Sequence, residues 1–382
     1  KREMSDLHTE TQENKDFNPE SDERVRDVSF LKRALKKPEL GAISGAILVF
    51  IFFGFTASDT GMFASDGILN WASVSAQLGI IAIGACLLMI AGEFDLSIGS
   101  MIGFAGVMIA IPTMYWSWPV WASILFAFAG AMLIGFINGS IVVKTGLPSF
   151  IVSLAFLFIL RGLTIAFAIM FTGRTIIGGV RDRAVETADW MLPVFNGNLF
   201  TGFFKWMGEN GIIATFPDGT PLVPGIPMLI VWWIILAVVS SFILLKTRFG
   251  NWIFASGGDA IAARNVGVPA GRVKILLFMF TAFCATLYAS CQIMEFGSAA
   301  ADRGLLKEFE AIIAAVIGGT LLTGGYGSVV GACFGALIFG VVQMGIFFTG
   351  INSDWFRVFL GGMLLIAVVF NNFVRKKVTE AT

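Results

Sequence analysis

The sequence predicts an all-α polytopic membrane protein with about ten transmembrane helices. Hydrophobic residues make up 56% of the 382-residue chain, whereas charged residues make up only 14%. Several apolar runs exceed the ~20 residues that a helix needs to cross the hydrocarbon core of a bilayer. The chain is therefore expected to be an integral membrane protein rather than a soluble protein with a large core.

Ten apolar segments are long enough to be spans. In chain order they are Gly41–Ala57, Trp71–Gly92, Leu96–Met114, Trp118–Val143, Ser149–Phe171, Ile226–Leu245, Val273–Met294, Leu305–Leu322, Tyr326–Phe348 and Trp355–Val374. They predict a transmembrane domain at residues 39–375, between a polar tail at 1–38 and a short tail at 376–382. The first tail is charged and poor in apolar side chains, which favours disorder. It lacks the short apolar core and cleavage site of a signal peptide.

Positive charge is expected to lie mainly on one side of the membrane. Because ten is an even number, both termini fall on the same side. This topology places 18 Lys and Arg residues on the side of the termini and 7 on the other, with Arg161 inside a span. The side richer in Lys and Arg is expected to be cytoplasmic. Both tails and the loop at 246–274 are thus predicted to be cytoplasmic, and the long segment at 173–225 external.

Cysteine and histidine usage excludes several function classes. The cysteines have no metal-ligand spacing, lie in apolar runs and are expected to be buried small side chains: Cys86, Cys284, Cys291 and Cys333. The single histidine, His8, lies in the polar tail, which removes most His-based catalysis and metal binding. Formal net charge is zero, so nothing favours a nucleic-acid partner. The Gly-rich run at 318–327 lacks the Gly-Lys-Ser/Thr of a phosphate loop, so no nucleotide site is expected.

The loop at 246–274 contains the pattern of a short exposed helix. Asp259 is a good N-cap, residues 260–266 can form a helix, and Gly267 followed by Pro269 is a stop signal. The pattern describes roughly two helical turns between basic residues. Two interpretations are open: an ordinary connecting loop, or a helix that another protein grips.

The run GEFDLSIGS at 92–100 places Glu93 and Asp95 in otherwise apolar sequence. Asp95 can N-cap a helix that begins at Leu96. If the helix break lies deeper in the membrane, these carboxylates must face a polar cavity or a partner. Discontinuous helices with N-termini in a cavity are a recurring feature of transporters. Both roles are open, with interhelical hydrogen bonding as the plainer alternative for the other polar side chains. The candidate pathway residues are Glu93, Asp95, Ser97, Ser100, Asn138 and Gln292.

Arg161 lies in the middle of the fifth predicted span. An isolated guanidinium there should face the bundle interior and find a carboxylate or backbone carbonyls. Glu93 and Asp95 are candidate partners. We expect a structural pairing rather than contact with a substrate.

Two features concern the arrangement of the spans. Glycines recur every four residues, as at Gly99 and Gly103, Gly135 and Gly139, and Gly327 to Gly335, which lets helices approach closely. Spans two to five and seven to ten are equal in number and opposite in orientation, which permits an inverted repeat. The external segment at 173–225 is long and aromatic, which favours an ordered region that contacts a partner or the membrane surface.

Four collinear segments resemble a known family: residues 92–100, 138–162 (NGSIVVKTGLPSFIVSLAFLFILRG), 255–268 (ASGGDAIAARNVGV) and 308–332 (EFEAIIAAVIGGTLLTGGYGSVVGA). They are similar to the permease subunit of ribose/xylose/inositol-type monosaccharide ABC importers, within the group that includes branched-chain amino-acid and nucleoside permeases. The resemblance implies a homodimeric or pseudo-symmetric permease of the bacterial inner membrane, two cytoplasmic ATPase subunits that bind ATP and Mg, and a periplasmic binding protein. The chain itself would be no enzyme and carry no cofactor.

The resemblance also assigns the short cytoplasmic helix as the coupling helix that seats in a groove on the ATPase. Its residues are Asp259, Ala260, Ile261, Ala263, Arg264, Asn265 and Gly267. The solute would be a monosaccharide or polyol. The alternatives are an ion-coupled secondary transporter that uses Glu93 or Asp95, and an ABC permease for nucleosides or branched-chain amino acids.

Overall fold

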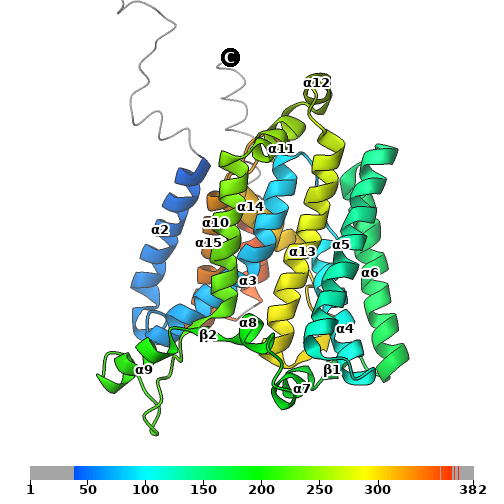
Figure 1. Cartoon of the computed structure of the whole chain (residues 1–382). Coiled ribbons are helices and arrows are strands. Elements are labelled where there is room, and N and C mark those ends of the chain that lie inside the picture. Colours follow the sequence, from blue (N-terminus) through cyan, green and yellow to red (C-terminus); the bar gives the residue numbers. More distant parts are fainter. Residues whose placement is uncertain (1–37, 353, 364, 366–368, 370–382) are drawn as a thin grey trace, which may run out of the picture. The chain divides into compact units, whose positions relative to one another are not determined.

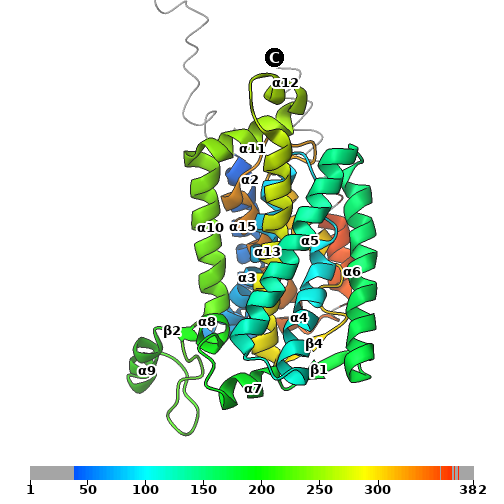
Figure 2. The ribbon, with the colours of Figure 1, turned by 45° about the vertical axis from the view of Figure 1, so that its right-hand side comes forward.

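The computed structural model describes residues 38–352, 354–363, 365 and 369. The two predicted tails therefore lie outside the described residues, apart from Pro38, where the first helix begins. Figures 1 and 2 show a bundle of long helices that run between two ends of the domain, with short elements gathered at both ends. This compact unit begins at Pro38.

Within the described residues, eight helices are long and apolar enough to cross a membrane. They are α2 (Pro38–Thr56), α3 (Ser65–Ile90), α4 (Ile98–Tyr115), α5 (Val120–Thr145), α6 (Ser149–Thr172), α10 (Met228–Lys246), α13 (Ala270–Phe296) and α15 (Val329–Phe348). They match the first seven predicted spans and the ninth. Residues 355–363 are helical and begin the tenth, most of whose remainder lies outside the described residues.

The eighth predicted span is not a single membrane-length helix. The segment predicted at Leu305–Leu322 contains α14 (Lys307–Ile317), which has 11 residues. Eleven residues span roughly 16 Å, about half of a bilayer's hydrocarbon core. Hydropathy alone missed this, because residues 305–306 before α14 and the Gly-rich loop after it extend the apolar run beyond the helix.

Four helices form the centre of the bundle. In α3 and α4, 83% of the most apolar window is buried inside the protein, and the values for α13 and α15 are 67% and 61%. The corresponding share is 17% in both α2 and α6, which lie at opposite edges of the bundle in Figure 1. Since lipid is as apolar as these helices, close packing rather than hydrophobicity must hold them together.

Glycine faces provide that packing, as the four-residue spacing predicts. A Cβ atom at Gly135 of α5 would lie 2.7 Å from the carbonyl oxygen of Phe278 in α13, and one at Gly139 would lie 2.9 Å from Cα of Ile275. On α15, a Cβ at Gly335 would collide with the carbonyl of Ala314 in α14. Any larger side chain at these positions would force the helices apart.

The segment between α6 and α10 is folded. It contains α7 (Val180–Glu186), α8 (Leu192–Asn196) and α9 (Thr201–Glu209), and it contributes strands to two short antiparallel pairs. Strand β1 (Ile176–Gly178) pairs with β4 (Ser298–Ala300), and β2 (Asn198–Leu199) pairs with β3 (Ile226–Pro227). The first pair ties this segment to the chain that follows α13, at the end of the bundle opposite α12 (Ala260–Asn265) in Figure 1.

Candidate functional site

Two of the central helices, α3 and α13, are each followed by a non-helical break and then a second helix. The first break covers residues 91–97 and leads into α4, and the second covers residues 297–306 and leads into α14. The N-terminal ends of α4 and α14 meet inside the bundle. A Cβ atom at Gly99 would lie 2.5 Å from the carbonyl oxygen of Gly304 and would collide with the carboxylate of Glu308. Glycine at position 99 permits this approach.

Asp95 is the centre of a buried hydrogen-bond network in the first break. Its Oδ1 accepts from the backbone N–H (2.8 Å) and the hydroxyl (2.5 Å) of Ser97, and its Oδ2 accepts from the Thr281 hydroxyl on α13 (2.6 Å). Asn138 of α5 donates to the Ser97 hydroxyl at 3.4 Å. Asp95 is 7% exposed. The network therefore ties the break to two neighbouring helices.

The predicted helix start at Leu96 is wrong by two residues. Helix α4 begins at Ile98 with Ser97 at the N-cap position, and no side chain caps it. Asp95 instead accepts from the N–H two residues ahead, as in the turns that Asp side chains commonly close.

Glu93 has a cationic partner that the sequence left unidentified. Lys274 Nζ, near the start of α13, lies 2.5 Å from Glu93 Oε1, and both side chains are 14% exposed. One residue further, the backbone N–H of Phe94 donates to the Ser149 hydroxyl of α6 at 3.0 Å. The first break is thus held on one side by α13 and on the other by α6.

Arg161 pairs with a backbone carbonyl. Its Nη1 donates to the carbonyl oxygen of Ala301, in the second break, at 3.1 Å. The suggested partners, Glu93 and Asp95, were wrong, because both carboxylates are engaged elsewhere. Of the general expectation, the carbonyl is the hydrogen-bond partner, and the guanidinium also attracts the Glu308 carboxylate electrostatically.

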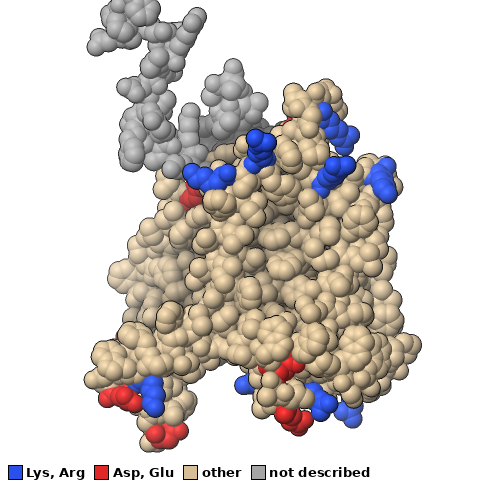
Figure 3. Space-filling model, viewed as in Figure 1, with Lys and Arg blue, Asp and Glu red and all other residues tan. Residues whose placement is uncertain are grey.

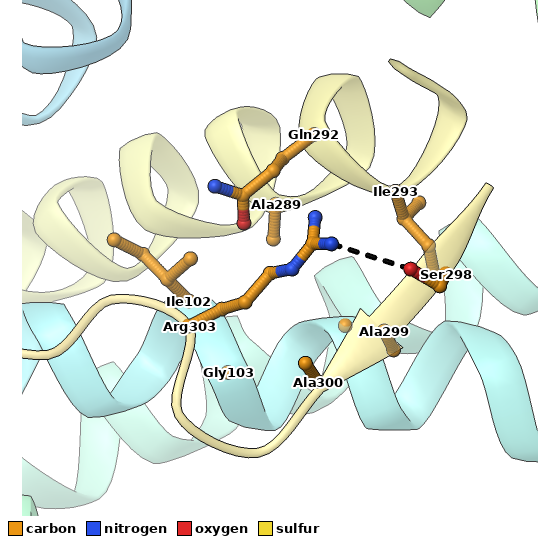
Figure 4. Close-up of a pocket in the computed structure, with 10 residues that line it drawn as sticks. Ile102, Gly103, Ala289, Gln292, Ile293, Ser298, Ala299, Ala300 and Arg303 are labelled. Carbon is orange, nitrogen blue, oxygen red and sulfur yellow. Dashed lines mark hydrogen bonds between the residues drawn. The ribbon is translucent and has the colours of Figure 1, made fainter. Parts of the chain in front are cut away.

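A small cavity lies between α4, α13 and the second break (Figure 4). Its polar side chains are Gln292, Ser298 and Arg303. The Arg303 Nη2 donates to the Ser298 hydroxyl at 3.2 Å, and the guanidinium lies 4.5 Å from the centre of the Phe296 ring. Gln292 donates to the Tyr288 hydroxyl at 2.8 Å. Of the candidate pathway residues, Gln292 is the one that lines this cavity.

The remaining candidates lie away from it. The Ser100 hydroxyl and Oδ1 of Asn138 are buried and have no hydrogen-bond partner within the described part of the chain. The sequence analysis did not single out Arg303 and Glu308, which fall before the eighth predicted span and within it. The signal that could have separated them is the charge at the start of that span, where Lys307, Glu308 and Glu310 lie close together.

At the opposite end of α13 from this cavity, the predicted short helix is present as α12, and its caps are those predicted. The Asp259 carboxylate accepts from the N–H groups of Ile261 and Ala262, both at 2.9 Å. Gly267 has a φ of +85°, and the bonds from Gly267 N to Arg264 O and from Val268 N to Ala263 O close the helix in a Schellman motif. Ala263 is buried, whereas Ile261 and Val266 are 74% and 79% exposed. Two large apolar side chains thus protrude from α12, together with exposed Arg264 and Asn265.

Helix α12 stands at the most basic end of the described domain. In Figure 3, Lys and Arg dominate the end that carries α12, and both signs of charge are mixed at the other end. The exposed basic residues at the α12 end are Lys144, Lys246, Arg248, Arg264 and Arg272.

Four glycines bring the chain before α12 into contact with the end of α3 and with the loop between α14 and α15. The helix before it, α11 (Arg248–Gly258), has its C-terminal end against the end of α3. A Cβ at Gly257 would collide with the carbonyl of Ile90, the last residue of α3. The Gly325 N–H, in the loop between α14 and α15, donates to that same carbonyl at 2.8 Å. A Cβ at Gly324 would lie 2.8 Å from both the Gly257 carbonyl oxygen and Cα of Gly92. We call Gly92, Gly257, Gly324 and Gly325 the glycine junction.

Known proteins with similar sequences are transport permeases. The chain is 28% identical over 366 residues to the xylose transport system permease protein of Escherichia coli, covering 88% of this chain and 92% of the relative. It is 31% identical over 336 residues to a probable ABC transporter permease protein of Sinorhizobium fredii, covering 88% and 90%. It is 30% identical over 315 residues to the ribose import permease protein of Haemophilus influenzae, covering 82% and 88%. The branched-chain amino acid transport system / permease component family matches residues 67–368, and the chain belongs to this family of membrane proteins.

Proposed function

We propose that this chain is the permease subunit of an ATP-binding-cassette importer that takes up a monosaccharide or polyol. The observation that carries the proposal is α12, a capped helix with exposed apolar side chains at the basic end of a membrane domain. Relatives named for xylose and ribose support the class of solute. ATP and Mg would be bound and ATP hydrolysed by separate ATPase subunits, so this chain would have no catalytic residues of its own.

The proposed topology has ten crossings with both termini in the cytoplasm. Residues 301–306 together with α14 make one crossing, part turn and part helix, and the helix that starts at residue 355 makes the last. The basic α12 end is then cytoplasmic by the positive-inside rule. The order of long helix, break, helix, helix, helix is the same from α3 to α6 and from α13 to residue 363, which supports an inverted repeat.

In this mechanism, α12 receives the movement of the ATPase and the glycine junction passes it on. Ile261 and Val266 would fill a groove on the ATPase, with Arg264 beside them. Backbone contacts at Gly257 and Gly325 leave little room for side-chain adjustment, so a displacement of α11 must move the end of α3. The ATPase thereby shifts the balance between outward-open and inward-open arrangements, by binding one better than the other.

The first break would act as the cytoplasmic latch of the pathway. The Glu93–Lys274 ion pair and the Asp95 network hold residues 91–97 against α13 and α5. Closure of the ATPase would move α3 and α13 relative to each other and break these contacts. In this reading Glu93 and Asp95 are positioning residues, and the solute passes beside them.

Two further partners follow from the importer class. A second copy of the chain would complete the membrane assembly, and a solute-binding protein would dock on the external end. The folded segment at 173–225 presents exposed Trp190, Phe200 and Trp206 at that end. These aromatic side chains suit a docking surface for a protein or the headgroup region of the membrane.

The test is uptake into proteoliposomes that contain this chain, its ATPase subunit and its solute-binding protein, with D-xylose and D-ribose as probes. We expect accumulation that requires ATP and Mg on the ATPase side and is indifferent to an imposed proton or sodium gradient. Uptake that proceeds without ATP and follows such a gradient would identify an ion-coupled secondary transporter instead.

A further inference from the structure

Residues 200–225, which we call the α9 loop, leave and rejoin the bundle where α10 begins. Strand β2 leads into the loop and β3 leads out of it, and the two strands are paired. A Cβ atom at Gly225 would lie 2.5 Å from the carbonyl oxygen of Leu199, so the two ends of the loop are closely joined. The N–H of Met228, the first residue of α10, donates to the Gly197 carbonyl at 2.9 Å. The base of the loop is therefore fixed at the level where a membrane-length helix enters the bilayer.

The α9 loop carries a cluster of exposed large apolar side chains. Those with between 48% and 65% of their surface exposed are Phe200, Phe203, Trp206, Ile212 and Phe216. The Phe203 and Trp206 rings are stacked, with their centroids 5.9 Å apart and their planes at 21°. A cluster of this kind, unlike apolar residues exposed singly, marks a surface that contacts a protein or a membrane.

Helix α9 keeps its apolar side and its charged side apart. Phe203 and Trp206 are three residues apart and share one side of the helix. Gly208 faces the rest of the loop, since a Cβ atom there would lie 3.0 Å from a side chain further along it. Lys205 and Glu209 are four residues apart, lie on a third side and are exposed. In Figure 3 the charged side chains at the lower left corner lie along its outer edge, away from the long helices. This is the pattern of a helix that lies flat at a membrane surface.

Figures 1 and 2 place α9 at the side of the bundle rather than across its end. It lies beyond α2 in the first view and beyond α10 in the second, near the level where these helices end. In the most apolar windows of α2 and α10, 17% and 28% of the residues are buried, so both helices present most of their surface to lipid. The α9 loop continues this lipid-facing surface at the membrane boundary. A protein that approached this end from water would meet the charged side of the loop first.

We propose that the α9 loop is an interfacial anchor whose partner is the phospholipid of the adjacent leaflet. Phe203 and Trp206 reach roughly 5–10 Å into the boundary between headgroups and acyl chains, while Lys205 and Glu209 remain in water. The loop has one positive and two negative side chains, the second acid being Asp218. Its attraction to the membrane is therefore apolar and does not require anionic lipid. The proposal needs only the membrane domain and stands apart from the import function.

The primary test is photo-crosslinking of the purified full-length chain in phosphatidylcholine nanodiscs. The photoreactive residue p-benzoylphenylalanine replaces Trp206 in one variant and Lys205 in the matched control, so the two probes lie on different sides of the same helix. Mass spectrometry of the irradiated chain measures the phospholipid adduct. We expect at least about threefold more adduct at position 206 than at 205, because only the apolar side reaches the acyl chains. Equal yields at the two positions would overturn the proposal.

A second readout uses the chain's own aromatic residue. The chain has 10 tryptophans, and the fluorescence difference between the wild type and Trp206→Phe isolates the Trp206 indole. In nanodiscs whose phosphatidylcholine is brominated on its acyl chains, this difference should be at least about twofold weaker than in unbrominated lipid. Trp206→Phe keeps an apolar ring at an exposed position, so the variant should fold as the wild type does. A difference signal that bromination leaves unchanged would contradict the anchor.

Two further arms of the crosslinking experiment identify the partner. Adding the solute-binding protein should leave the lipid adduct at position 206 unchanged, whereas a docking surface would lose this adduct and crosslink to that protein instead. Replacing about a third of the phosphatidylcholine with phosphatidylglycerol should change the yield less than about twofold, because the loop carries no net positive charge. Loss of the adduct in the first arm would replace the anchor with a protein interface. A larger rise in the second would show an electrostatic attraction that the proposal excludes.

Discussion

Lys274 and Glu93, which are 181 residues apart in the chain, form an ion pair in which Nζ and Oε1 are 2.5 Å apart. It joins the start of α13 to the break that follows α3. Each side chain is 14% exposed, so water screens the pair only weakly. The ion pair therefore holds the break after α3 against α13 at the end of the bundle that carries α12.

The first prediction concerns this pair. Lys274→Met leaves the Glu93 carboxylate without its cation in a largely buried position, and should lower the free energy of unfolding by about 3 kcal/mol. The measurement is thermal unfolding of the purified chain in detergent. Removing both charges, as in Glu93→Gln with Lys274→Met, should restore most of the loss. Arg183→Met, which breaks the exposed Arg183–Glu186 pair, is the control and should change little. An equal loss of unfolding free energy in Lys274→Met and in the control Arg183→Met would contradict the prediction.

The glycine junction gives a second prediction. Gly257→Ala places a methyl group into the carbonyl of Ile90, and the ends of α11 and α3 must separate to admit it. We expect ATP-dependent uptake to fall at least about tenfold, a barrier change of at least about 1.4 kcal/mol, while ATPase subunits still bind. Gly258→Ala is the matched control, because no atom lies within 4 Å of its Cβ position. If the two variants transport equally, the junction does not carry the movement.

A third prediction addresses α12. Arg264→Glu reverses a charge in the last turn of this exposed helix, and should abolish transport by weakening attachment of the ATPase. The measurement is the ratio of ATPase to permease after copurification, alongside solute affinity of the binding protein, which should not change. Arg272→Glu makes the same charge change on the first turn of α13 and should retain the ATPase. Normal stoichiometry and coupling in Arg264→Glu would count against the assignment of α12.

Arg161 is the subject of the fourth prediction. Arg161→Ala removes the donor that holds the Ala301 carbonyl and frees the second break, so it should destabilise the fold by about 1–3 kcal/mol with little effect on solute preference. Thermal unfolding gives the first quantity, and competition between D-xylose and D-ribose during uptake gives the second. A well-folded variant with altered preference would reverse this assignment and place Arg161 among the solute contacts.

Features set by local residue order could be predicted from the sequence. Composition and run length were enough for an all-α membrane domain and for eight of the spans, because a bilayer accepts only long apolar helices or closed barrels. The caps of α12 were equally readable, since Asp259 and Gly267 act within a few residues of themselves. Glycine spacing indicated which helix faces approach closely, without showing which helices would meet.

The tertiary structure decided which charged groups are paired and where the helices are interrupted. Glu93, Asp95 and Arg161 looked alike as charges in apolar sequence, yet one pairs with Lys274, one with Ser97 and Thr281, and one with the Ala301 carbonyl. Three of the four cysteines are buried as expected, and Cys333 is partly exposed. The opposition of Gly99 and Glu308 was likewise invisible, because it depends on residues about 200 positions apart. Hydropathy records the cost of leaving water, which is a property of each segment, whereas partner choice depends on how the helices pack against one another.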